Sequence, residues 1–372
     1  MYDQTQRRKG MKILFDIARY LVGALFIFSG VIKVNDPIGT AIKLQEYFEV
    51  FAYDFAPFFE WFVPAALFLA VLLSVLEVVL GIALIIGFKM PRTSWALLLM
   101  IVFFTFLTFY SAYFNKVTDC GCFGDAIKLT PWQSFYKDLI LLVLIIAIFK
   151  NRHQYGSWFS EKFGFFKVVG SAIVFTLLAY YAIAHLPFLD FRAYAVGNHL
   201  PSLMEPSEEL RYQYVMEKDG KEEILDTYPT DKAYTFKAME LINPEAQPKI
   251  TDLSVWNDEG EFTEELLRGN KLLIVIYDAT KASRTNIEAI KTLTSQTQNA
   301  DVWVLTASGY EEFEAFRHDV QLAAPYFYAD ATVLKTMIRS NPGVMLLSNG
   351  TVVGKWHHND TPDVSEINGL LP

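Results

Sequence analysis

Long apolar runs fill the first half of the chain and are separated by short polar segments. Each of five runs is long enough to cross a hydrocarbon core of about 30 Å as a helix. The fourth is the weakest, because Lys137 and Asp138 interrupt its beginning. The pattern therefore predicts five transmembrane helices, over residues 13–34, 58–87, 95–114, 132–149 and 165–186.

The segment after the fifth run, residues 188–247, contains several prolines and little helical spacing, so we interpret it as a linker. Within it, residues 211–225 hold two short strand-like stretches on either side of Asp219-Gly220. Aspartate followed by glycine is a preferred pair at a two-residue hairpin turn. The linker is therefore predicted to contain one β-hairpin, and no element is predicted over residues 226–247.

From residue 248 to the end, apolar strand-like segments alternate with helical ones. Residues 272–277 and 302–306 are continuous apolar runs, as expected of strands that are buried on both faces. A stretch with helical spacing follows each of them, and Asn349-Gly350 separates two final strand-like segments. This order predicts an α/β sheet that ends in a hairpin.

Composition supports a membrane protein, since 52% of the 372 residues are hydrophobic and 31 of them are Phe. The charge is uneven. Residues 1–186 carry a net charge of +4, whereas residues 187–372 carry −13. An acidic second half disfavours a nucleic-acid partner, because the phosphate backbone is bound by basic surfaces. The lipid bilayer is therefore an expected partner and nucleic acid is not.

Basic residues lie mostly on one side of the predicted spans. With a cytoplasmic N-terminus, ten Lys and Arg residues fall in cytoplasmic segments and three in the opposite loops. Cytoplasmic loops are enriched in such residues. The first run is interpreted as an uncleaved span, because no clear small-x-small cleavage site follows it. These patterns predict a bacterial inner-membrane protein whose residues after Leu186 are periplasmic.

The only two cysteines, Cys120 and Cys122, flank Gly121 in the loop after the third span. The predicted orientation places this loop in the periplasm, where a disulfide can persist. Three states remain open: a redox-active pair, a static disulfide, and a soft-metal site. A metal would need further ligands, and no His or Cys lies in the neighbouring loop. We treat Cys120 and Cys122 as a candidate redox pair and expect no metal and no cofactor.

Polar residues inside the apolar runs form a second set of candidates. Glu77 lies near the middle of the second span, where a carboxylate is costly unless it is protonated, paired or hydrated. Lys33, at the outer end of the first span, is its candidate partner. A structural hydrogen bond between two helices is the simpler interpretation of this pair. Arg19 is expected to extend toward the cytoplasmic interface.

His357 and His358 lie next to each other beside Asp360. Adjacent residues on a strand point to opposite faces, so the two rings make a poor chelate. They are expected to be exposed and to bind no metal.

Three short sequences stand out in residues 1–150: Phe28–Lys33, Glu77 with Gly81, and Asp119–Gly124. Together they resemble those of the DoxX and MauE group of membrane proteins. This resemblance implies a four-helix membrane domain, associated with redox processes or thiol maturation in the envelope. Residues 151–187 would then add a cytoplasmic loop and a fifth, tethering helix.

Residues 248–372 contain a strand that ends at Tyr277, a helix after it, and Asn341-Pro342 before the final hairpin. They resemble a thioredoxin-like domain of the envelope type, in which a cis-proline precedes the penultimate strand. The family's Cys-x-x-Cys would fall near Lys281–Arg284, where this chain has no cysteine. The resemblance therefore implies a domain that cannot exchange disulfides but keeps a binding groove, with Pro342, Tyr277 and Lys281 as candidate residues.

These observations favour an accessory protein of an extracytoplasmic thiol/disulfide or protein-export and maturation pathway. Such a protein would not be a self-sufficient enzyme, because one cysteine pair needs a second pair on another protein. Envelope proteins or a larger membrane complex are the expected partners. The alternative is a purely structural subunit of an envelope membrane complex with no redox chemistry. A transporter finds little support, since no internal repeat is present.

Overall fold

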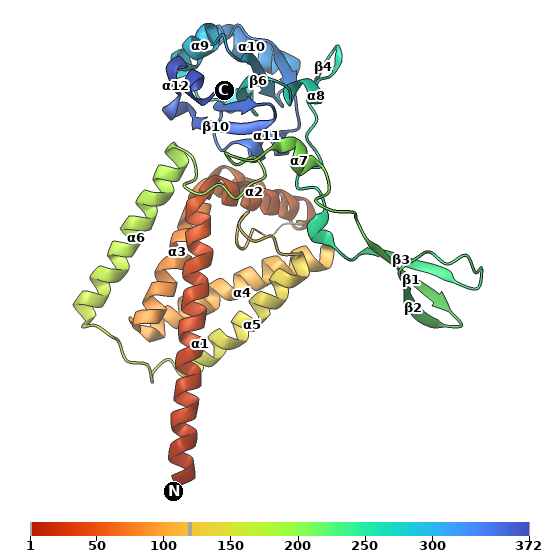
Figure 1. The fold of residues 1–372 in the computed structure, drawn as a ribbon. Coiled ribbons are helices and arrows are strands. Elements are labelled where there is room, and N and C mark those ends of the chain that lie inside the picture. The colour runs from red at the N-terminus through yellow and green to blue at the C-terminus, as the bar shows by residue number, and fades with distance from the viewer. Residues whose placement is uncertain (1, 118–120, 372) are drawn as a thin grey trace. The chain divides into compact units, whose positions relative to one another are not determined.

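The computed structural model describes residues 2–117 and 121–371 and consists of two compact units, Met1–Phe191 and Arg192–Pro372 (Figure 1). The first unit is helical, and all the described strands lie in the second. The predicted order of apolar helices followed by a sheet-rich part is therefore confirmed. The helices of the first unit are α1 (Tyr2–Asn35), α2 (Pro37–Asp54), η1 (Pro57–Ala65), α3 (Ala66–Ile86), α4 (Met90–Phe114), α5 (Pro131–Lys150) and α6 (Glu161–Ala184).

Five helical stretches among the described residues are long and apolar enough to cross a membrane. They agree with the five predicted spans to within a few residues. Large apolar side chains such as Leu99 and Val143 remain exposed on the outside of the bundle, as expected where lipid replaces water. The stretches are Ile13–Asn35, Pro57–Ile86, Met90–Phe114, Pro131–Lys150 and Glu161–Ala184.

Glycines bring α1 and α3 into close contact. A Cβ atom on Gly81 would lie 2.7 Å from the carbonyl oxygen of Gly23, and one on Gly30 would lie 2.8 Å from that of Ser74. Any larger residue would clash with the neighbouring backbone. Small residues at such contacts let membrane helices approach closely, so these positions fix how α1 and α3 pack.

Helix α2 was not predicted from the sequence. It begins directly after α1, where the Asp36 side chain accepts a hydrogen bond from the Gly39 N–H at 2.8 Å and Pro37 occupies the first turn. Both features are typical helix starts. Tyr47 and Phe51 pack with residues of α4, so one face of α2 belongs to the core of the first unit.

The second unit contains a small sheet in the order β2-β1-β3. Strands β1 (Tyr212–Lys218) and β2 (Lys221–Leu225) are antiparallel, and Asp219 and Gly220 both have positive φ angles at the turn. The hairpin predicted from this pair is confirmed. Strand β3 (Thr235–Leu241) pairs with the other edge of β1 and was not predicted.

The larger sheet has seven strands in the order β10-β9-β6-β7-β8-β4-β5. Strands β6, β7 and β8 are parallel, whereas β9 pairs antiparallel with β6 and β10. Its strands are β4 (Trp256–Asn257), β5 (Gly260–Glu261), β6 (Asn270–Ile276), β7 (Asp301–Thr306), β8 (Tyr326–Tyr328), β9 (Gly343–Ser348) and β10 (Thr351–His357). The helices around it are α9 (Ile287–Gln296), α10 (Tyr310–Val320), α11 (Ala331–Met337) and α12 (Val364–Leu370), and two short helices, α7 (Leu200–Met204) and α8 (Thr263–Leu266), precede β6.

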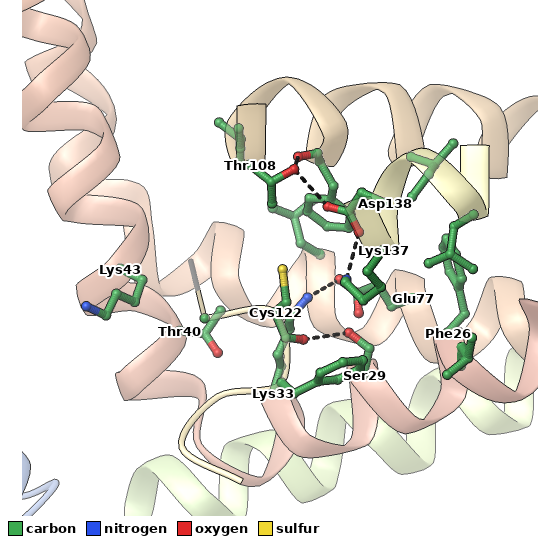
Figure 2. Close-up of a pocket in the computed structure, with 18 of the residues that line it drawn as sticks. Phe26, Ser29, Lys33, Thr40, Lys43, Glu77, Thr108, Cys122, Lys137 and Asp138 are labelled. Atoms are coloured by element: carbon green, nitrogen blue, oxygen red, sulfur yellow. Dashed lines mark hydrogen bonds and ion pairs between the residues drawn. The ribbon is translucent and has the colours of Figure 1, made fainter. Parts of the chain in front are cut away.

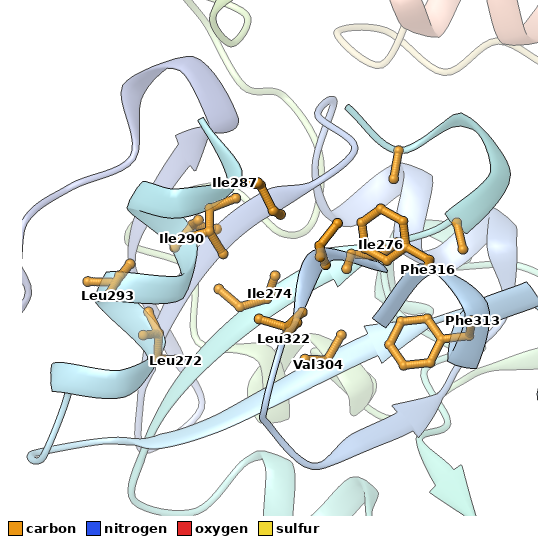
Figure 3. Close-up of a cluster of buried hydrophobic side chains, with 14 of the residues drawn as sticks. Leu272, Ile274, Ile276, Ile287, Ile290, Leu293, Val304, Phe313, Phe316 and Leu322 are labelled. Carbon is orange, nitrogen blue, oxygen red and sulfur yellow. The ribbon is translucent and has the colours of Figure 1, made fainter. Parts of the chain in front are cut away.

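The core of this sheet is centred on β6. Leu272 and Ile274 pack with Ile290 of α9 and Phe313 of α10 (Figure 3). Every residue from Leu272 to Ile276 is fully buried, so β6 is covered on both faces, as its continuous apolar sequence predicted.

Candidate functional site

A cavity lies inside the first unit, between α1, α2, α3, α4, α5 and the loop that contains Cys122 (Figure 2). The volume of the cavity is about 80 Å³. Apolar side chains form most of its wall, and charged side chains enter it from α1, α3 and α5. The apolar lining residues are Leu25, Phe26, Leu44, Leu73, Ile101, Phe104, Leu107, Phe123 and Leu141.

Lys33 and Glu77 form a buried ion pair across α1 and α3. The Lys33 ammonium donates to Glu77 Oε1, and the two side chains are only 10% and 2% exposed. The ammonium also lies 4.8 Å from the centre of the Phe104 ring. Glu77 Oε2 has no hydrogen-bond partner among the described residues. The structure thus brings together the two residues that the sequence suggested as partners and leaves one carboxylate oxygen unsatisfied.

A second ion pair, Lys137 with Asp138, enters the cavity from α5. Their charged atoms are 2.7 Å apart, and Asp138 is 2% exposed. The Thr108 hydroxyl on α4 donates to Asp138 Oδ2 at 3.0 Å. Lys137 also interacts electrostatically with Cys122 and Glu77. In the sequence this pair stood out only as an interruption of the fourth span, so its place in the site was missed.

Cys122 lines the cavity, and its sulfur points inward (Figure 2). The Ser29 hydroxyl of α1 donates to the Cys122 carbonyl oxygen at 2.9 Å, which holds the loop against the bundle. Gly121 and Gly124 on either side have positive φ angles, a backbone conformation that glycine adopts without strain. Cys120, the other member of the predicted redox pair, lies outside the described residues.

Thr40 and Lys43 of α2 also line the cavity. The Lys43 ammonium lies 3.2 Å from a Glu46 carboxylate oxygen. Each of the three lysines that line the cavity therefore has a carboxylate partner, and the site carries no large excess of either charge.

The predicted groove residues lie in the second unit. The Asn341–Pro342 peptide bond is cis. Tyr277 is half-buried, and burial raises the pKa of its hydroxyl. The Lys281 side chain is 81% exposed and lies 2.9 Å from Asp278. The carbonyl of Asn341, the residue before Pro342, accepts a hydrogen bond from the Ser283 N–H at 2.8 Å, so the chain itself uses this backbone acceptor.

The expectation that His357 and His358 are both exposed was wrong, and so was the expectation that Arg19 extends toward the interface. His357 is buried, and its ring lies 4.0 Å from that of His358, because β10 ends at His357 and a 3₁₀ turn over His358–Asp360 follows. The burial of His358 lowers its pKa. Arg19 does not extend into solvent. Its guanidinium donates to the Tyr20 hydroxyl at 2.7 Å and lies over the Tyr155 ring.

Residues 11–150 match the family described as methylamine utilisation protein MauE, which confirms that part of the resemblance. Over 171 residues the chain is 25% identical to Protein TlpB of Flavobacterium psychrophilum; the match covers 45% of this chain and 43% of that protein. The chain therefore matches under half the length of this curated relative. No solved structure matches the chain.

Proposed function

We propose that this chain is a membrane accessory protein of an extracytoplasmic thiol–disulfide pathway, and that Cys122 is its exchanging thiol. The observation that carries the proposal is the cavity that Cys122 shares with Lys137. A thiolate is the reactive form of cysteine, and a neighbouring ammonium group stabilises it. A charged residue inside a membrane bundle is also costly and marks a functional position by default.

The proposed step is a thiol–disulfide exchange. The Cys122 thiolate attacks one sulfur of a partner disulfide, a mixed disulfide forms, and the second partner sulfur leaves as a thiolate. Cys120 is proposed as the resolving thiol that displaces the partner and closes a disulfide with Cys122. The partner therefore leaves reduced by two electrons, and the pair in this chain is oxidised.

The proposed location is the bacterial inner membrane, with a cytoplasmic N-terminus and with both cysteines and the second unit in the periplasm. It is supported by the five candidate spans and by the concentration of basic residues on one side of them. In a variant without the native cysteines, a membrane-impermeant maleimide is expected to label Lys128→Cys, an exposed position of the same loop, in intact cells. Labelling that appears only after lysis would place the loop in the cytoplasm and contradict this orientation.

For the rest of the chain we propose a four-helix domain (1–150), a loop and tethering helix (151–187), a linker with a hairpin (188–247) and a thioredoxin-like domain without redox cysteines (248–372). The strand order β7-β6-β9-β10, the helices after β6 and β7, and the cis bond before β9 support the last of these. Its role would be to bind an envelope protein through exposed side chains such as Lys281, with the half-buried Tyr277 and the buried Pro342 as the other candidate residues.

The second candidate function is a structural subunit of an envelope membrane complex with no redox chemistry. One observation favours it. Lys33 with Glu77 and Lys137 with Asp138 are matched pairs, which is how a static bundle would hold buried charges together. The two functions differ in whether Cys122 reacts in the folded protein.

That difference is measured with the reduced full-length protein in lipid nanodiscs, incubated with hydroxyethyl disulfide. We expect intact-mass spectra to show first a mixed disulfide and then an oxidised Cys120–Cys122 pair. A Cys120→Ser variant should accumulate the mixed disulfide, because no resolving thiol remains. If the folded protein stays unmodified while the denatured protein reacts fully, the structural subunit is the correct function.

A further inference from the structure

We infer that the cavity selects the partner of Cys122, and that the partner is an uncharged disulfide with an apolar body and a hydrogen-bond donor. This inference rests on the proposed exchange at Cys122 and names its substrate class. Three independent features of the cavity carry it: the balance of its charges, the nature of its wall, and one unsatisfied carboxylate oxygen.

The charges in the cavity are already matched. Lys33 is bonded to Glu77, and Lys137 is 2.7 Å from Asp138. An anionic or cationic partner would lose its hydration on entry, and each ammonium group that the described residues contribute to the cavity wall already has a carboxylate partner. Burial of an ion without a partner is strongly unfavourable. The cavity therefore discriminates against charged disulfides of either sign.

The wall of the cavity that Cys122 lines is mostly apolar and partly aromatic. Phe26, Phe104 and Leu141 reach it from three different helices. An apolar body placed against these side chains leaves water, which favours binding in proportion to the buried area. Small-molecule sites commonly combine such a wall with a few polar groups that fix the orientation of the ligand.

The third feature is Glu77 Oε2. Glu77 is 2% exposed and lines the cavity, and this oxygen has no hydrogen-bond partner among the described residues. Buried polar atoms are normally satisfied, and a carboxylate oxygen only accepts. A partner that carries an O–H or N–H beside its sulfur supplies the missing donor. This oxygen therefore distinguishes a neutral donor from a purely apolar molecule.

The test uses the full-length Cys120→Ser protein in nanodiscs and four methanethiosulfonates: hydroxyethyl, propyl, sulfonatoethyl and trimethylammonioethyl. In each reaction the Cys122 thiolate attacks the sulfenyl sulfur, a mixed disulfide forms, and methanesulfinate leaves. Rates are divided by those of mercaptoethanol in the same buffer. A Ser207→Cys protein that lacks both native cysteines gives the rates of an exposed thiol in the second unit.

The hydroxyethyl reagent is expected to react at Cys122 about tenfold faster than either charged reagent, because an ion loses its hydration on entry. Its normalised rate should also exceed that of the propyl reagent, which matches it in size but has no hydrogen-bond donor. At Ser207→Cys no such preference is expected. Normalised rates within about twofold of one another, or a clear preference for one sign of charge, would overturn the inference.

A second variant tests the role of Glu77 without leaving a lone buried charge. Lys33→Met combined with Glu77→Leu removes both partners together. The ratio of the hydroxyethyl rate to the propyl rate should fall to about one in this protein, and an unchanged ratio would contradict the role of Glu77 Oε2. If Cys122 reacts with none of the reagents, the proposed exchange itself fails; if it reacts without selectivity, only this inference fails.

Discussion

Replacement of Lys137 with Met is expected to raise the pH at which Cys122 is half-maximally alkylated by about one unit, which slows the reaction at neutral pH by about tenfold. The Lys137 ammonium interacts with Cys122, and its removal leaves Asp138 as the nearest charge on α5. A negative neighbour disfavours a thiolate. The measurement is the rate of iodoacetamide alkylation against pH, in a Cys120→Ser background.

Asp138→Asn is expected to shift the pH of half-maximal alkylation in the opposite direction. It leaves the Lys137 ammonium without its carboxylate partner, so the half-maximal pH should fall rather than rise. Lys128→Met is the matched control, because Lys128 is an exposed residue of the same loop that does not line the cavity. If Lys137→Met and Asp138→Asn shift the profile in the same direction, if neither shifts it, or if Lys128→Met shifts it as much as Lys137→Met does, Lys137 does not control the reactivity of Cys122.

Glu77→Ala is expected to destabilise the first unit by about 3–5 kcal/mol, because it leaves a buried ammonium without its partner. Lys33 is 10% exposed, lies between α1 and α3, and has little access to water. The measurement is the thermal unfolding of the solubilised protein, followed by circular dichroism or by proteolysis at increasing temperature.

The double variant Lys33→Met, Glu77→Leu is the control for this loss. It removes both charges and replaces them with apolar groups, so its stability should lie close to that of the unmodified protein or above it. Unfolding of Glu77→Ala at the temperature of the unmodified protein would show that Lys33 finds another partner or water in its place.

The helical half was predictable from sequence because its signal is direct. Apolar runs long enough to cross a bilayer seldom occur except as membrane spans, and all five were found. Helix α2 was missed because its 18 residues mix Lys43, Glu46 and Glu49 with apolar positions and are flanked by spans. Only the packing of Tyr47 and Phe51 against α4 reveals that it forms part of the core.

In the second half, the sequence predicted an element correctly where a residue pair specifies a turn. It did not predict a strand whose pairing depends on residues far away in the chain. Asp219-Gly220 identified the hairpin. Strand β3 is mostly exposed and shows no clear alternation, so its pairing with β1 could not be read from its own sequence. The two histidines were assigned to opposite faces because the sequence did not reveal that the strand ends at His357.

The candidate site was only half predictable. Glu77 and Lys33 were found because a charge within an apolar run needs a partner. Lys137 and Asp138 are equally charged, but they lie near the beginning of a span, where water is a plausible neighbour. Sequence spacing cannot show that this end of α5 is turned toward Cys122.

The glycine contacts between α1 and α3 bear on how this site can change. Gly30 lies three residues from Lys33, and Gly81 lies four residues from Glu77, so backbone contacts without intervening side chains set the register of the two helices. The meeting of the two charged groups is therefore a result of main-chain packing and not its cause. Acidic, amide or apolar side chains can therefore replace one another where α1 and α3 cross, while the packing of the two backbones stays the same.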